Sequence, residues 1–160
     1  MKPVGKPIAL HFSGCGGCMS VIESFSVIDN LGSYDRAANP QGLSVWELLP
    51  TGVAWSFLGY SYKIENPHKL IPKLLLDGIG IAVVIAPFNT KENKALIVKS
   101  DGDLMWDISA AAKAIVGQGV FSDVYYVSGQ LCFFVNINNI DHRFSFDVVS
   151  GAVGVLIPSY

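Results

Sequence analysis

Charged residues are scarce in this 160-residue chain. They make up 15% of it, against about 25% in ordinary globular domains. The net charge is −2 and no block of Lys and Arg occurs, so the chain lacks the basic patch that nucleic-acid binding requires. Hydrophobic residues account for 51%, which leaves much apolar surface without charged cover. We therefore expect a peptide or protein partner, or self-association into a homo-oligomer, and no nucleic-acid ligand.

Long apolar runs are also missing. The longest, Ile79 to Phe88, is shorter than the roughly 20 residues that span a bilayer, so no transmembrane segment is expected. Near the N-terminus, Pro3, Lys6 and Pro7 interrupt the apolar stretch that a secretory signal needs. This pattern favours a cytoplasmic protein. The alternative is a lipoprotein anchored through Cys15, because Phe12-Ser13-Gly14-Cys15 resembles a lipobox.

Cysteine is rare and its count is odd. Three cysteines do not suit a disulfide framework, which favours an even number, and reduced thiols agree with a cytoplasmic location. The length suits a single domain, residues 1–160.

The order of the expected elements is helices early and an antiparallel sheet late. Ile79 to Ala86 is a continuous apolar run rich in β-branched residues, which predicts a strand buried on both faces. Ser44 and Glu47 have the spacing of a capping box. The predicted helices are 19–31, 44–58, 68–76 and 109–116. The predicted strands are 7–12, 60–64, 79–86, 95–99, 104–107, 120–127, 131–137, 142–149 and 152–157. This is an α+β layout.

The segment Gly14-Cys15-Gly16-Gly17-Cys18 places two cysteines just before the first predicted helix. A helix start carries unpaired amide groups and a partial positive charge. A thiol there ionises more easily, and the thiolate is the reactive form. The segment therefore predicts a cysteine nucleophile or a redox pair.

The chain resembles papain-like cysteine peptidases, in particular the domains that cleave leader peptides after a double glycine. Cys15-Gly16 matches the family's Cys-Gly pair, and Gly42 to Leu49, with Leu58-Gly59-Tyr60 after it, matches its second segment. Residues 95–107 match a hairpin that ends in an aspartate, Asp107. The resemblance covers about residues 8–127. It implies a papain-like fold, with an N-terminal Cys-bearing helix packed on a C-terminal antiparallel sheet.

The resemblance also implies a cysteine peptidase or amidase that uses no cofactor, with Cys15 as nucleophile and Asp107 orienting a histidine. The family's histidine position falls on Asn93 or Lys94, and the glutamine expected before the cysteine is absent. His142, at the start of a late strand, is the candidate general base. Without a base, the domain would bind a peptide without cleaving it.

Three further interpretations stay open. Cys15 and Cys18 have the spacing of a thioredoxin-like redox pair. Zinc would need Cys15, Cys18, Cys132 and His142 together, but Cys132 lies in an apolar strand and suits core packing, so we expect no metal. The third interpretation is a binding or assembly module without catalysis.

Overall fold

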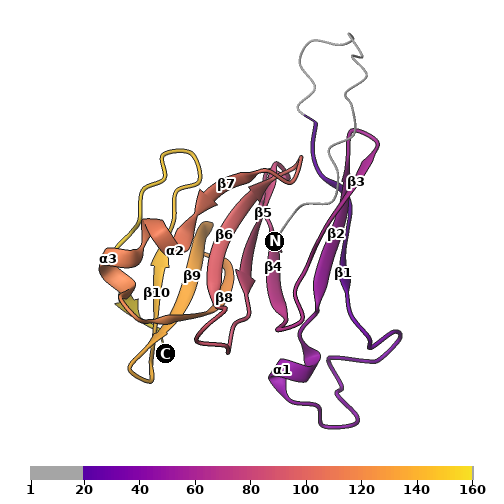
Figure 1. The fold of residues 1–160 in the computed structure, drawn as a ribbon, viewed down its shortest axis with the longest axis horizontal. Helices are drawn as coiled ribbons and strands as arrows, with labels where there is room; N and C mark the ends of the chain where they lie inside the picture. Colours follow the sequence, from indigo (N-terminus) through magenta and orange to yellow (C-terminus); the bar gives the residue numbers. More distant parts are fainter. Residues whose placement is uncertain (1–19, 160) are drawn as a thin grey trace.

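The structure, a computed structural model, describes residues 20–159, which form three antiparallel sheets stacked as layers (Figure 1). Sheet A contains β1 (Glu23–Ile28), β2 (Gly52–Phe57) and β3 (Tyr60–Glu65). Sheet B contains β4 (Leu70–Leu74), β5 (Gly80–Ile85), β6 (Lys94–Lys99) and β7 (Leu104–Asp107). Sheet C has the order β11-β10-β9-β8, from β8 (Val120–Val127), β9 (Gln130–Ile137), β10 (Ile140–Ser145) and β11 (Ile157–Pro158). The helices of this region are single turns: α1 (Val45–Leu48), α2 (Ile108–Ala111) and α3 (Lys113–Val116).

Sheet B is the middle layer, and its strand β5 is buried on both faces. Ile81, Val83 and Ile85 lie in the core shared with sheet A. Ala82 and Val84 lie in the core shared with sheet C. Successive side chains of a strand point to opposite faces, so one apolar strand serves two cores. The prediction of a doubly buried strand here is confirmed.

Two tryptophans link the layers through hydrogen bonds. The indole Nε1 of Trp55, in sheet A, donates to the carbonyl oxygen of Ser100 after β6 at 2.7 Å. The indole Nε1 of Trp106, in sheet B, donates to the carbonyl oxygen of Val148 after β10, also at 2.7 Å. Each indole ring packs against apolar side chains, while its N–H donates a hydrogen bond to a backbone carbonyl of the neighbouring layer.

The predicted papain-like α+β fold is wrong. The residues expected to form the body of the first helix form β1 instead, and Cys15 lies outside the described residues. A bulge between Glu23 and Ser26 inserts one residue into β1. Ile22 and Phe25, three residues apart, therefore both reach the core between sheets A and B. Residues three apart also lie on one face of a helix, which is why the sequence pattern predicted a helix here.

Two other predicted helices are also corrected. Residues 70–74, predicted as part of the helix 68–76, form β4, which pairs with β5 along its whole length. Asn66 and Pro67 are residue types that often begin a helix, but pairing with the apolar strand β5 outweighs this local preference. The helix predicted over 44–58 is only α1, and β2 follows it. The capping box is confirmed: the Ser44 hydroxyl accepts from the Glu47 N–H, and the Glu47 carboxylate accepts from the Ser44 N–H.

The late antiparallel strands are confirmed as β8, β9 and β10, whereas the last predicted strand is reduced to β11 and a single bridge between Phe146 and Val153. The helix predicted over 109–116 is two short turns, α2 and α3. The predicted strand 7–12 lies outside the described residues.

Val83→Asp tests the central position of β5. Val83 is fully buried, and an unpaired carboxylate there should cost about 4 kcal/mol or more. We expect the variant to show no cooperative thermal unfolding transition when its melting is measured by circular dichroism. Leu104→Asp, at a position 57% exposed on the same sheet, should melt nearly as the wild type does. A cooperative Val83→Asp variant with an unchanged Tm would contradict the three-layer arrangement.

Candidate functional site

Of the predicted catalytic residues, the structure describes two, Asp107 and His142, and places them in different sheets. Cys15 and Cys18 lie outside the described residues. The Asp107 carboxylate caps α2 by accepting from the Ala110 N–H at 3.0 Å. His142 lies in another sheet, on β10, with its Nδ1 2.9 Å from the carbonyl oxygen of Ile140. Asp107 and His142 are thus both engaged with nearby backbone, and no hydrogen bond joins them.

Asn93 is one of the two positions where the resemblance expects a histidine. Its side chain forms hydrogen bonds with the backbone of two sheets. Its amide Nδ2 lies 3.3, 3.1 and 2.9 Å from the carbonyl oxygens of Ile85, Ala86 and Phe121. Its Oδ1 accepts from the Phe121 N–H at 2.8 Å. The side chain therefore joins the end of β5 to the start of β8, and so sheet B to sheet C.

Cys132 is a core residue, as its apolar neighbours in the sequence predicted. It lies on β9 and is buried, and burial raises the pKa of its thiol. A buried neutral thiol is a poor nucleophile. Within residues 20–159, no three His, Cys, Asp or Glu side chains are grouped closely enough to hold a metal ion. The same residues contain no helix long and apolar enough to cross a membrane.

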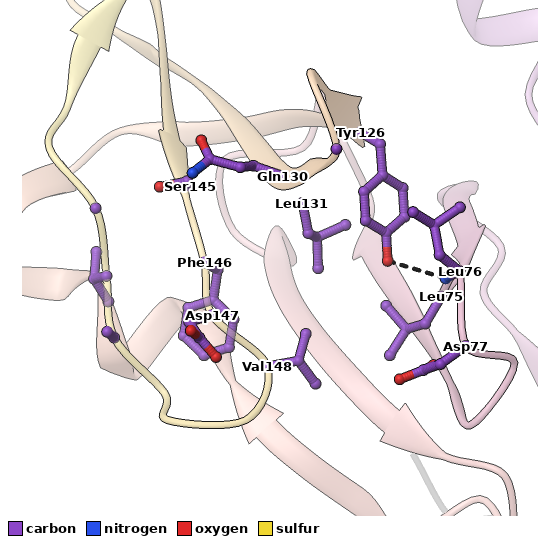
Figure 2. A pocket seen from close by; sticks show the side chains of 14 residues that line it. Leu75, Leu76, Asp77, Tyr126, Gln130, Leu131, Ser145, Phe146, Asp147 and Val148 are labelled. Atoms are coloured by element: carbon purple, nitrogen blue, oxygen red, sulfur yellow. Dashed lines mark hydrogen bonds between the residues drawn. The ribbon is translucent and has the colours of Figure 1, made fainter.

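A cavity of about 560 Å³ opens where one end of sheet B meets sheet C (Figure 2). We call it the end cleft. It is lined by the turn after β4, by the hairpin between β8 and β9, and by the segment that follows β10. The volume falls in the range of about 300–1,000 Å³ that is usual for binding pockets. The lining residues are Leu75, Leu76, Asp77, Tyr126, Gly129, Gln130, Leu131, Ser145, Phe146, Asp147, Val148, Ala152, Val153 and Gly154.

The wall formed by the turn after β4 is held by a hydrogen bond between layers. The backbone N–H of Leu76 donates to the hydroxyl oxygen of Tyr126 on β8 at 3.1 Å (Figure 2). Within the turn, the Asp77 carboxylate accepts from the Ile79 N–H at 3.1 Å. This wall is therefore formed before any ligand arrives.

The opposite wall is the turn at residues 147–152. Asp147 Oδ1 accepts from the backbone N–H groups of Val149 and Ser150, at 2.9 and 3.0 Å. Gly151 has a φ of +76°, and a Cβ there would lie 2.5 Å from Trp106 Cη2. Only glycine permits this close approach. The indole bond from Trp106 to Val148 then fixes the turn on sheet B.

The end cleft combines an apolar interior with negative charge at its sides. Figure 2 shows Asp77 and Asp147 on opposite sides, with apolar side chains between them. The hydrogen bonds from Ser150 and Val149 hold the pKa of the Asp147 carboxyl below its usual value, so it is ionised at neutral pH. Among residues 20–159, none of those that line the cleft is Lys, Arg or His.

Two large apolar side chains flank the end cleft and face solvent. Leu76 is 74% exposed and Val149 is 95% exposed. Leu76 lines the cleft, whereas Val149 does not line it but lies in the 147–152 turn, next to the lining residue Val148. Apolar side chains set around a preformed concave site are typical of contact surfaces for other molecules.

A second exposed apolar surface lies beside α1. Trp46 and Phe88 are both substantially exposed and line a shallower hollow with His68. The Lys69 ammonium lies 4.9 Å from the Trp46 ring centroid and donates to the carbonyl oxygen of Leu49. This surface shares no lining residue with the end cleft.

Comparisons with known proteins identify a similar fold but no family. No family model and no curated protein matches the chain. Among solved structures, a chain from the structure of Tne2 in complex with Tni2 is similar, with a TM-score of 0.62 and 13% sequence identity. The match covers 88% of this chain and 100% of that chain. At this identity the likeness shows the fold alone.

The sequence contained only part of the signal for the end cleft. Residues 150 and 151, which separate the predicted strands 142–149 and 152–157, lie in one wall. The opposite wall lies about 70 residues earlier in the chain, at the end of the segment predicted as the helix 68–76. A cleft built from two distant turns was therefore not visible as a motif.

Cys132 should be the least reactive cysteine of the folded protein, because its thiol is buried and neutral at pH 7.5. We expect iodoacetamide to modify it only after unfolding in urea, as measured by mass spectrometry at timed intervals. If Cys132 reacts in the folded state faster than Cys15 and Cys18, both its place in the core and the expected reactivity of Cys15 are wrong.

Asn93→Ala should destabilise the protein by about 3 kcal/mol, because it removes the hydrogen bonds that its side chain makes with backbone groups of two sheets. Urea denaturation measures this loss. Asn136→Ala is the matched control, since Asn136 hydrogen-bonds Asp141 at the surface and should cost less than about 1 kcal/mol. Equal losses for the two variants would contradict the role of Asn93 between the sheets.

Proposed function

We propose that this protein is a binding module that recognises another protein or an extended peptide without chemical turnover, and that the end cleft is its contact site. The observation that carries the proposal is the hydrogen-bonded cleft itself, with exposed Leu76 in its lining and exposed Val149 in the turn that forms the opposite wall. A preformed site reduces the entropy that binding would otherwise cost.

Two further points support the proposal. Asp107 and His142 form local hydrogen bonds in different sheets, so these two residues are not assembled as an acid–base pair. The similar fold belongs to a structure in which two proteins, Tne2 and Tni2, form a complex. A sandwich of this kind is thus compatible with binding a protein partner.

Binding at the end cleft can be tested with the purified chain and a displayed library of random 12-residue peptides. We expect enriched peptides to bind the wild type, as measured by fluorescence anisotropy. The double variant Leu76→Ser/Val149→Ser should bind them at least tenfold more weakly, because it removes the apolar contacts on both walls. The matched control is Leu58→Ser/Leu104→Ser, at exposed positions that do not line the cleft.

Three results would contradict the proposal. The first is a library that yields no binding peptide. The second is equal weakening by the cleft variant and the control variant. The third is cleavage of a bound peptide by the wild type, detected by mass spectrometry, because the proposed module leaves its ligand intact.

A further inference from the structure

The charges of the end cleft restrict what it can receive. Asp77 and Asp147 carry its formal charges, and no cation lines it. Neither carboxylate forms an ion pair within residues 20–159. A negative ligand group would be repelled here, whereas a positive group gains charge-assisted hydrogen bonds.

The interior of the cleft suits the stem of a long side chain. Leu75, Leu131 and Phe146 are buried residues that line it, and Val148 and Val153 add partly buried apolar surface. Lys and Arg place their aliphatic stems along apolar surface and keep the charged group near water. Both carboxylates are exposed, so an ammonium or guanidinium group could meet them without full desolvation.

The surroundings of the cleft point to a protein ligand rather than a small free amine. Leu76, which lines the cleft, and Val149, in the turn of the opposite wall, are both exposed. Their apolar surface would contact residues on either side of an inserted side chain, and a small amine would leave it uncovered. Exposed apolar residues around a central anchor are the arrangement found at protein interfaces.

We propose that the end cleft receives one Lys or Arg side chain of a protein partner, with its stem against the apolar interior and its charge beside Asp147, while Asp77 on the opposite side adds to the negative potential. This inference rests on the proposed function and specifies the chemistry of the ligand. The hydrogen bonds that order the 147–152 turn and the Tyr126–Leu76 bond hold both carboxylate-bearing turns in place before binding.

The peptides enriched on the wild type provide the test. We expect each tight binder to contain a Lys or Arg between apolar residues. Replacing that Arg by citrulline, or that Lys by norleucine, removes the charge and keeps the stem. This replacement should weaken binding to the wild type about tenfold. Binding should also weaken as salt is raised from 0.05 to 0.5 M.

Protein variants complete a double-mutant cycle. Asp147→Asn keeps an oxygen that can accept from Val149 and Ser150, so an unchanged Tm shows that the turn persists. The Asp147→Asn variant should bind the charged peptide about tenfold more weakly and bind the neutral analogue as the wild type does. Asp77→Asn should also weaken binding of the charged peptide. Glu92→Gln, an exposed change away from the cleft, is the control and should bind as the wild type does.

The outcomes separate this inference from the proposed function. Peptides without Lys or Arg that lose affinity for Leu76→Ser/Val149→Ser would overturn the basic anchor and leave the binding function standing. A charged peptide that binds Asp147→Asn and the wild type equally would do the same. Peptides insensitive to Leu76→Ser/Val149→Ser would overturn both the function at this cleft and the anchor.

Discussion

The structure depends on covering both faces of β5. Every residue of this strand is buried, and its side chains alternate between two cores. Leaving either face of this apolar strand in water would reduce the stability of the fold. The loss is roughly 25 cal/mol for every Å² of apolar surface that stays exposed. Sheet A covers one face and sheet C the other, which makes three layers from a chain of 160 residues.

The stacking also explains where the end cleft lies. Sheets B and C share a core dominated by Phe121, Phe133, Phe144 and Phe146, whose rings pack edge-to-face or stacked. At one end of this core the connecting turns, rather than paired strands, close the space between the sheets. Turns carry polar backbone and side-chain groups, so the end of an apolar core becomes a cleft with charged sides. Trp106 fixes one of these turns through a hydrogen bond and through its contact with Gly151.

The misplaced helices have specific physical causes. The bulge in β1 spaces Ile22 and Phe25 as a helix would. Asn66 does provide a side-chain cap, because its Oδ1 accepts from the His68 N–H at 2.8 Å. That bond closes a local turn, after which Lys69 adopts a φ of +72° and the chain enters β4. Local signals of this kind are compatible with either outcome, and pairing with β5 decides between them.

The sequence by itself determined the strand at β5, the capping box at Ser44, the late antiparallel hairpins and the core position of Cys132. These features follow from short-range patterns: continuous apolar runs, cap spacing and turn residues. Only the tertiary structure decided that β1 and β4 are strands, that Asn93 joins two sheets, and that Asp77 and Asp147 flank one cleft. These features depend on contacts between segments far apart in the chain. Local sequence patterns do not show which distant segments come together in the fold.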